Sequence, residues 1–131
     1  MREPKIEEGD VFRFLFARID SVPHLEALLL IWRSRPRPWH AADISANLFI
    51  EAKEGEKLVH DLLRRGLIAV SASDPSCFRY PEGDAQQEAM MKAIEETYRK
   101  DLIKVSRFIH SKQRNSMSDF ADAFRFRKDQ N

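Results

Sequence analysis

The residues of this sequence that could form a binding site through their clustering are lysines and arginines, because their charged side chains bind phosphates and carboxylates. Arg33, Arg35 and Arg37 lie close together in a proline-rich connector. They either contact the phosphates of a nucleic acid or belong to a solvated loop, and the sequence favours neither. Residues 99–131 hold nine Lys/Arg against four Asp/Glu, whereas residues 1–98 hold 13 against 17. The net charge of +1 therefore conceals a basic C-terminal arm.

Side chains needed for catalysis or metal binding form no recognisable pattern. The histidines show no H-x-x-x-H pairing, no Gly-x-Ser-x-Gly elbow occurs, and the four glycines build no phosphate loop. The single cysteine, Cys77, excludes an intrachain disulfide framework and a cysteine-rich zinc site. We expect Cys77 to be a small buried apolar residue. The sequence therefore predicts neither an enzyme nor a bound metal or cofactor.

Length and hydropathy predict one compact domain outside the membrane. The 131 residues, of which 43% are hydrophobic, suffice for one domain with a core of its own. The longest apolar run, residues 27–32, is far shorter than the roughly 20 residues of a membrane span. The start MREPKIEEGD does not have the pattern of a signal peptide. We therefore expect a cytoplasmic protein without membrane insertion.

The first third of the chain predicts two helices. Residues 1–9 are interpreted as a flexible lead-in, and Asp10 is expected to cap a helix that reaches about Ile19. The apolar residues of this helix recur at helical spacing and are Phe12, Leu15, Phe16 and Ile19. Ser21 is expected to cap a second helix that reaches Arg33. That helix is apolar almost all round, which is typical of a central core helix.

Residues 39–80 predict two helices followed by a hairpin. The helices are expected over about 42–48 and 52–65. Gly66 suits the end of the second helix, because glycine adopts the left-handed cap geometry without a Cβ clash. An Asp-Pro-Ser turn separates two short stretches with strand character. The expected strands are residues 67–70 and 77–80, with a short first strand at Trp39 that pairs with the hairpin.

This order of elements resembles the winged helix-turn-helix domain of bacterial transcription regulators. The residues that carry the resemblance are Ile44, Leu48, Leu58, Leu62, the junction Arg65-Gly66-Leu67-Ile68, and the pair Phe78 and Tyr80. The whole chain is also similar to small bacterial winged-helix proteins of unassigned function, in its Ile-Asp-Ser-Val start (19–22) and its Phe-Ala-Asp-Ala-Phe-Arg end (120–125). The resemblance implies a mainly helical α+β fold. Residues 10–83 would form the winged helix-turn-helix with an added N-terminal helix, and residues 84–131 a long C-terminal helical arm.

The resemblance also implies that the helix over 52–65 enters the major groove of duplex DNA. The DNA-binding candidates on this basis are Lys53, Lys57, His60, Arg64, Arg79, Arg35 and Arg37. The same helix is expected to expose carboxylates, at Glu51, Glu54, Glu56 and Asp61. Because carboxylates are repelled by phosphates, an ordinary solvated face with ion pairs explains this helix equally well.

The chain after Asp84 predicts one long helix, because no proline or glycine interrupts it from Ala85 onward. A helix over about 85–110 would be roughly 39 Å long. Its apolar residues recur every three or four positions and are Met91, Ile94, Tyr98, Leu102, Val105 and Ile109. Either the helix bends back over the domain, or this stripe forms a homodimer interface.

Two function hypotheses follow. The first is a small DNA-binding protein of transcription regulation that acts as a homodimer. The second is a winged-helix interaction module that binds an acidic protein partner, and not DNA, through its basic aromatic arm. The docking residues in the second hypothesis are Phe120, Phe124, Arg125 and Arg127.

Overall fold

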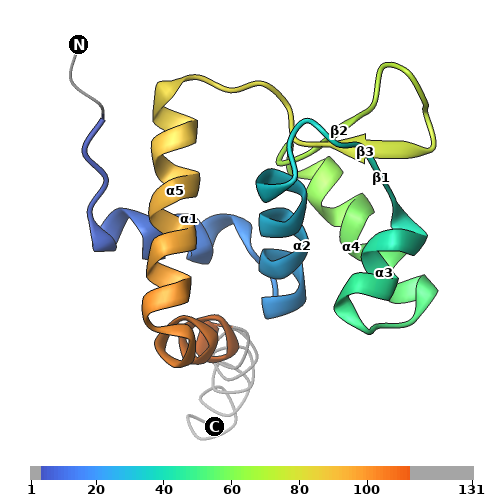
Figure 1. Ribbon diagram of the computed structural model, residues 1–131. Coiled ribbons are helices and arrows are strands. Elements are labelled where there is room, and N and C mark those ends of the chain that lie inside the picture. The colour runs from blue at the N-terminus through green and yellow to red at the C-terminus, as the bar shows by residue number, and fades with distance from the viewer. Residues whose placement is uncertain (1–3, 113–131) are drawn as a thin grey trace, which may run out of the picture.

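Helices dominate the structure, and a small antiparallel sheet accompanies them (Figure 1). The computed structural model describes residues 4–112. Its helices are α1 (Glu8–Arg18), α2 (Val22–Arg33), α3 (Ala41–Leu48), α4 (Ala52–Arg64), α5 (Ala85–Lys100) and the helical residues 102–112. Its strands are β1 (Trp39–His40), β2 (Ala69–Val70) and β3 (Cys77–Arg79). The predicted mainly helical α+β class is confirmed, and no helix among the described residues is long and apolar enough to cross a membrane.

The first two helices begin at acidic or hydroxyl caps. The Glu7 backbone N–H donates to Asp10 Oδ2 at 3.0 Å, and Glu7 is the N-cap of α1. The predicted cap at Asp10 is therefore wrong, and α1 includes two residues that the sequence assigned to the lead-in. At α2, the Ser21 hydroxyl accepts a hydrogen bond from the His24 backbone N–H at 3.3 Å. The predicted cap at Ser21 is confirmed.

α2 runs through the centre of the molecule, between α1 and α5 on one side and α3 and α4 on the other (Figure 1). Leu25, Leu28, Leu29 and Ile31 have no solvent exposure. Burying a leucine or isoleucine side chain contributes about 1.5–3 kcal/mol. The prediction that this nearly all-apolar helix forms the core is confirmed.

The apolar face predicted for α1 is only partly correct. Val11 and Leu15 are buried, but Phe16 is 60% exposed. The ammonium of Lys112 lies 5.6 Å from the centre of the Phe16 ring. Of the predicted face, Leu15 and Ile19 are thus buried and Phe12 is partly buried, whereas Phe16 lies largely in solvent.

The sheet has the strand order β1-β3-β2, and both pairs are antiparallel. Trp39 is the partner of Phe78 and His40 is the partner of Cys77. The short first strand predicted at Trp39 and its pairing with the hairpin are therefore confirmed. The hairpin strands are shorter than predicted, since β2 starts at Ala69.

The helix pair α3 and α4 depends on two glycines. A Cβ added to Gly55 would lie 1.7 Å from Ser45 Oγ and 3.2 Å from the Ala41 carbonyl oxygen, so only glycine lets the helices approach this closely. Gly66 has a φ of 72°, in the left-handed region where a side chain is strained. This geometry confirms the predicted stop after α4.

An unbroken helix over 85–110 is not found, and the alternative that the chain bends back over the domain is confirmed. α5 ends at Lys100, and Asp101 has non-helical backbone angles, with φ −144° and ψ 70°. Asp101 Oδ1 then accepts a hydrogen bond from the Lys104 backbone N–H at 3.1 Å, which caps the next helical segment. The chain therefore turns at Asp101 without proline or glycine, and the helical segment crosses beneath α5 in Figure 1.

The turn directs the apolar stripe into the protein's own core. Five of the six predicted dimer residues are at most 7% exposed in the single chain: Met91, Ile94, Tyr98, Val105 and Ile109. Leu102 is 53% exposed. A second chain cannot contact side chains that the first chain already covers, so the homodimer interface predicted on this stripe is corrected to an intramolecular packing surface.

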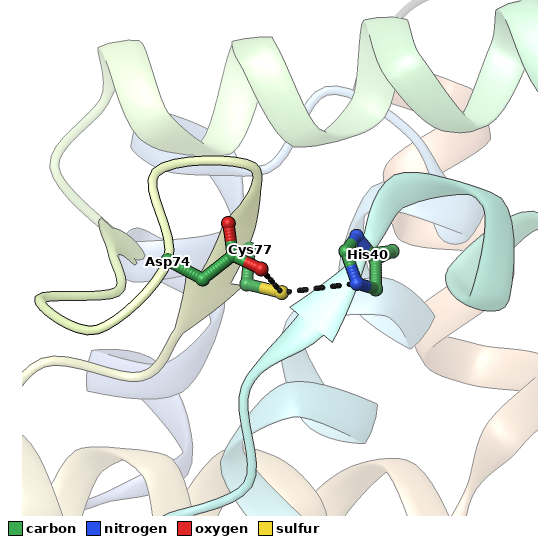
Figure 2. Close-up of side chains that lie close together, drawn as sticks. All are labelled: His40, Asp74 and Cys77. Atoms are coloured by element: carbon green, nitrogen blue, oxygen red, sulfur yellow. Dashed lines mark hydrogen bonds between the residues drawn. The ribbon is translucent and has the colours of Figure 1, made fainter.

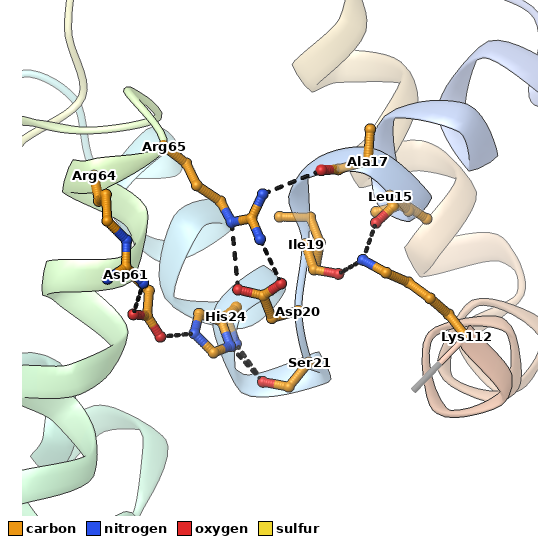
Figure 3. Close-up of polar contacts among 10 residues, drawn as sticks. All are labelled: Leu15, Ala17, Ile19, Asp20, Ser21, His24, Asp61, Arg64, Arg65 and Lys112. Atoms are coloured by element: carbon orange, nitrogen blue, oxygen red, sulfur yellow. Dashed lines mark hydrogen bonds and ion pairs between the residues drawn. The ribbon is translucent and has the colours of Figure 1, made fainter. Parts of the chain in front are cut away.

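The helical segment 102–112 is anchored on α1. Phe108 packs edge-to-face against Phe12, with the ring centres 4.8 Å apart. The Lys112 ammonium donates to the carbonyl oxygens of Leu15 and Ile19, at 3.4 and 2.7 Å, and so binds the last carbonyl groups of α1 (Figure 3). Burial lowers the pKa of Lys112.

Candidate nucleic-acid interface

The exposed face of α4 carries a row of basic side chains. Lys53, Lys57, His60 and Arg64 are all exposed, whereas Leu58, Val59 and Leu62 on the opposite face are buried. At 3.6 residues per turn the four side chains fall within about 60° of helical arc and span about 16 Å along the axis. We call these four residues the α4 basic row. It is long enough to cross a DNA major groove, which is about 12 Å wide.

Acidic residues flank the α4 basic row but do not interrupt it. Glu54 and Glu56 are exposed, and helical geometry places them roughly 70–90° to either side of the row. Asp61 was expected to face outward, but it is 8% exposed and lies on the inner side of the helix. That expectation is wrong, because Asp61 pairs with a side chain of α2. The helix that is mixed in sign along the sequence thus separates its charges around its circumference.

A buried hydrogen bond between an imidazole and a carboxylate joins α4 to α2 beneath the row. His24 Nε2 lies 2.8 Å from Asp61 Oδ2, and the two side chains are 9% and 11% exposed (Figure 3). The other oxygen of Asp61 accepts a hydrogen bond from Arg64 at 2.7 Å. Burial by itself raises the pKa of Asp61, but the His24 hydrogen bond and the charges of His24, Arg64 and Lys57 outweigh it, so the pKa is lowered. The pair fixes the orientation of α4 and leaves Arg64 75% exposed at the end of the row.

A second pair fixes the C-terminal end of α4. The Arg65 guanidinium binds both oxygens of Asp20, with Nη2 2.7 Å from Oδ1 and Nε 3.3 Å from Oδ2, and it also donates to the Ala17 carbonyl oxygen (Figure 3). Arg18 in turn donates to the Arg65 carbonyl oxygen. A bidentate pair of this kind constrains direction as well as distance. The α1–α2 junction thereby holds the end of the helix that carries the row.

A surface pocket of about 450 Å³ lies beside the row and contains three potential metal ligands. The ligand atoms of Asp20, His24 and Asp61 lie within 4.8 Å of one another. Arg64 and Arg65 already bind the two carboxylates. Two guanidinium charges at this distance oppose a metal cation. The cluster therefore acts as a set of fixed ion pairs that positions α4.

Arg35 and Arg37 of the connector both contact other side chains of the same chain. Arg35 forms an ion pair with Glu88 of α5 at 2.6 Å, and its guanidinium lies 4.6 Å from the Trp32 ring centre. The Arg37 guanidinium lies 3.9 Å from the Trp39 ring centre. Arg35 thereby ties the connector to α5.

Arg79 is separated from the α4 basic row. It is half-buried and donates to the Tyr80 carbonyl oxygen at 3.4 Å. It lines a pocket together with Arg35, and no residue of α4 lines that pocket. The structure therefore brings four of the seven DNA-binding candidates together on α4 and places the other three elsewhere.

The docking residues of the second hypothesis, Phe120, Phe124, Arg125 and Arg127, lie outside the described residues. The buried contact between His24 and Asp61 was missed because the two residues are 37 positions apart and neither belongs to a motif. No protein-family model matches the chain, and no curated protein or solved structure matches it.

Proposed function

We propose that this chain binds duplex DNA through the α4 basic row, as a winged-helix protein of transcription regulation. The observation that carries the proposal is the alignment of Lys53, Lys57, His60 and Arg64 on one exposed face of one helix. Three of these side chains can each neutralise a phosphate, and the imidazole of His60 can hydrogen-bond to a phosphate or a base edge.

The arrangement around α4 supports the same proposal. α3 packs closely on α4, and the β2–β3 hairpin follows α4 directly along the chain. In a helix-turn-helix protein the second helix of such a pair enters the major groove. Two polar contacts fix this helix on the rest of the protein, namely the buried pair of His24 and Asp61 and the bidentate pair of Arg65 and Asp20. Its outer face is thus rigid before any ligand binds, which lowers the entropy lost on binding.

The charge of the row sets the expected salt dependence. If Lys53, Lys57 and Arg64 each neutralise one phosphate, the logarithm of the association constant falls with the logarithm of the salt concentration with a slope of about −2.7. The hairpin adds little to this slope, because no lysine or arginine occurs between Ser71 and Phe78.

The test is fluorescence anisotropy of a labelled duplex, titrated with the full chain at several salt concentrations. Lys53→Glu with Lys57→Glu is the informative double variant. Lys92→Glu with Lys100→Glu, on exposed positions of α5, changes the net charge equally and is the matched control. All four substitutions are at exposed positions, so the unfolding free energy should change by less than about 0.5 kcal/mol each.

We expect the α4 double variant to lose most of the affinity and about 2 units of salt slope, and the control to keep the wild-type slope within about 1 unit. Equal losses in both variants would show that only net charge matters and would overturn the role of the row. A chain that does not bind duplex DNA even at low salt would overturn the proposal altogether.

A further inference from the structure

Three metal-binding side chains converge where the hairpin meets the start of α3. Cys77 Sγ lies 3.3 Å from His40 Nε2 and 3.5 Å from Asp74 Oδ2 (Figure 2). The ligand atoms of all three residues lie within 4.8 Å of one another. Cys77 is buried, Asp74 is half-buried and His40 is exposed, so the cluster opens to solvent on the side of the imidazole.

The backbone builds this convergence. His40 and Cys77 are direct partners in the antiparallel pair of β1 and β3. Side chains of directly opposed residues lie on the same face of a sheet. The turn before β3 brings in the carboxylate, because the Cys77 N–H donates to the Asp74 carbonyl oxygen at 3.0 Å. Ser76 donates twice to Asp74 Oδ1, at 2.9 and 2.7 Å, and so directs Oδ2 toward the thiol.

We propose that His40, Asp74 and Cys77 form a three-ligand Zn²⁺ site with a fourth position open to water. In tetrahedral zinc sites the metal lies about 2.3 Å from sulfur, about 2.0–2.1 Å from nitrogen and about 2.0–2.2 Å from oxygen. Two such ligands at the tetrahedral angle are then separated by roughly 3.5–3.7 Å when one of them is sulfur. The 3.5 Å distance from Cys77 Sγ to Asp74 Oδ2 matches this range, and the 3.3 Å distance to His40 Nε2 is slightly shorter. A rotation of the exposed His40 ring adjusts the distances of its nitrogen to both other ligands.

The charges of the cluster fit a divalent cation. In the metal-free protein the Cys77 thiol donates a hydrogen bond to Asp74 Oδ2 at 3.5 Å. Binding of Zn²⁺ forms a zinc–sulfur bond and releases one proton from the thiol to water. The thiolate and the Asp74 carboxylate then balance the charge of the ion. Unlike the cluster of Asp20, His24 and Asp61, this one has no guanidinium or ammonium group bound to its ligand atoms among the described residues.

The site does not depend on the proposed DNA binding. A bound ion would connect β3 and the turn before it to the residue that precedes α3. Cys77 and His40 are 37 positions apart in the chain. The sequence shows no metal motif because the pairing of β1 with β3, and not local spacing, brings the ligands together.

Titration of the reduced full chain with Co²⁺ tests the proposal. Cys77 is the only cysteine, so thiolate-to-cobalt charge-transfer absorption reports on this site alone. We expect this absorption to saturate at one Co²⁺ per chain and to disappear when Zn²⁺ is added. Cys77→Ser should abolish it, and His40→Gln and Asp74→Asn should each weaken Co²⁺ binding at least tenfold. His110→Gln, at an exposed histidine in the helical segment 102–112, is the matched control and should bind Co²⁺ like the wild type.

His40→Gln and Asp74→Asn keep the test decisive if Cys77→Ser fails to fold, because both side chains are at least partly exposed. No charge-transfer absorption in excess Co²⁺ would overturn the proposal. Binding that is unchanged in both of these variants, or that saturates at one Co²⁺ per two chains, would overturn the ligand set.

Discussion

Replacing Asp61 by alanine tests whether the buried pair of α2 and α4 holds the fold together. The substitution removes the carboxylate that lies 2.8 Å from His24 Nε2 and leaves that nitrogen without its partner, in a side chain that is 9% exposed. Arg64 loses the same carboxylate, but its side chain is 75% exposed and water replaces the contact. The cost should therefore come almost entirely from His24.

The expected magnitude follows from burial. A hydrogen bond to a charged carboxylate contributes about 1.5–3 kcal/mol, and an unsatisfied buried polar group costs about 1–3 kcal/mol. We expect Asp61→Ala to lower the free energy of unfolding by about 3 kcal/mol. For a chain of this size, that corresponds to a decrease in Tm of roughly 10 °C.

The assay is urea unfolding followed by circular dichroism, with Arg13→Ala as the control. Arg13 forms an ion pair with Asp10 at the same sequence spacing as Arg64 with Asp61, but its side chain is 77% exposed. The control should lose less than about 0.5 kcal/mol. In a double-mutant cycle, Asp61→Ala in a His24→Ala background should cost clearly less than it does alone.

The pH dependence gives an independent measurement of the same pair. The pKa of Asp61 in the folded protein lies below its ordinary value of 3.8. The stability that the charged carboxylate contributes is thus present above that ordinary pKa, and it is lost as pH falls through the folded pKa. The difference in unfolding free energy between wild type and Asp61→Ala should be largest above about pH 5 and should shrink below about pH 4.

Two results would refute the reasoning. A loss below about 1 kcal/mol for Asp61→Ala would place the pair in the range of exposed ion pairs. A difference between wild type and variant that stays constant down to low pH would show that the charge of Asp61 contributes nothing, and that the alanine acts only through packing.

Three glycine positions give further predictions, each measured as a change in urea unfolding. Gly55→Ala should cost about 1–3 kcal/mol, because the new Cβ would lie 1.7 Å from Ser45 Oγ, and Ser45→Ala in the same chain should recover part of that loss. Gly9→Ala meets no atom within 4 Å and should be neutral or stabilising by up to about 1 kcal/mol. Gly66→Ala should cost about 1–2 kcal/mol from strain at its φ of 72°, although the position is exposed. A cost at Gly9 equal to that at Gly55 would contradict the close approach of α3 and α4.

Local chemistry was sufficient to predict most element boundaries. The start of α2 followed from Ser21, whose hydroxyl accepts a hydrogen bond from a backbone N–H three residues later. The end of α4 followed from Gly66, which adopts a positive φ because it has no side chain. The central position of α2 followed from its lack of a polar face. The predicted α1 cap failed because Glu7 and Asp10 share the cap, and residue type alone does not say which of two acidic residues takes which position.

Contacts between distant residues could not be predicted. The apolar stripe from Met91 to Ile109 could pack either on a second chain or on the core of its own chain. The turn at Asp101 decides between these, because it places Val105 and Ile109 in the core. The same stripe pattern fits both outcomes, since a helix presents one apolar face to whatever covers it.

The sequence by itself determined which segments are helical and where most of them begin and end, because these depend on residues within a few positions of one another. The tertiary structure decided what the polar side chains do. In the folded protein Asp61 faces inward and contacts His24, and Arg35 forms an ion pair with Glu88. His40 lies opposite Cys77 in the sheet. The physical reason is that a charge or a ligand atom acts on its nearest neighbours in space, and only the packing of the helices and the pairing of the strands fix which neighbours those are.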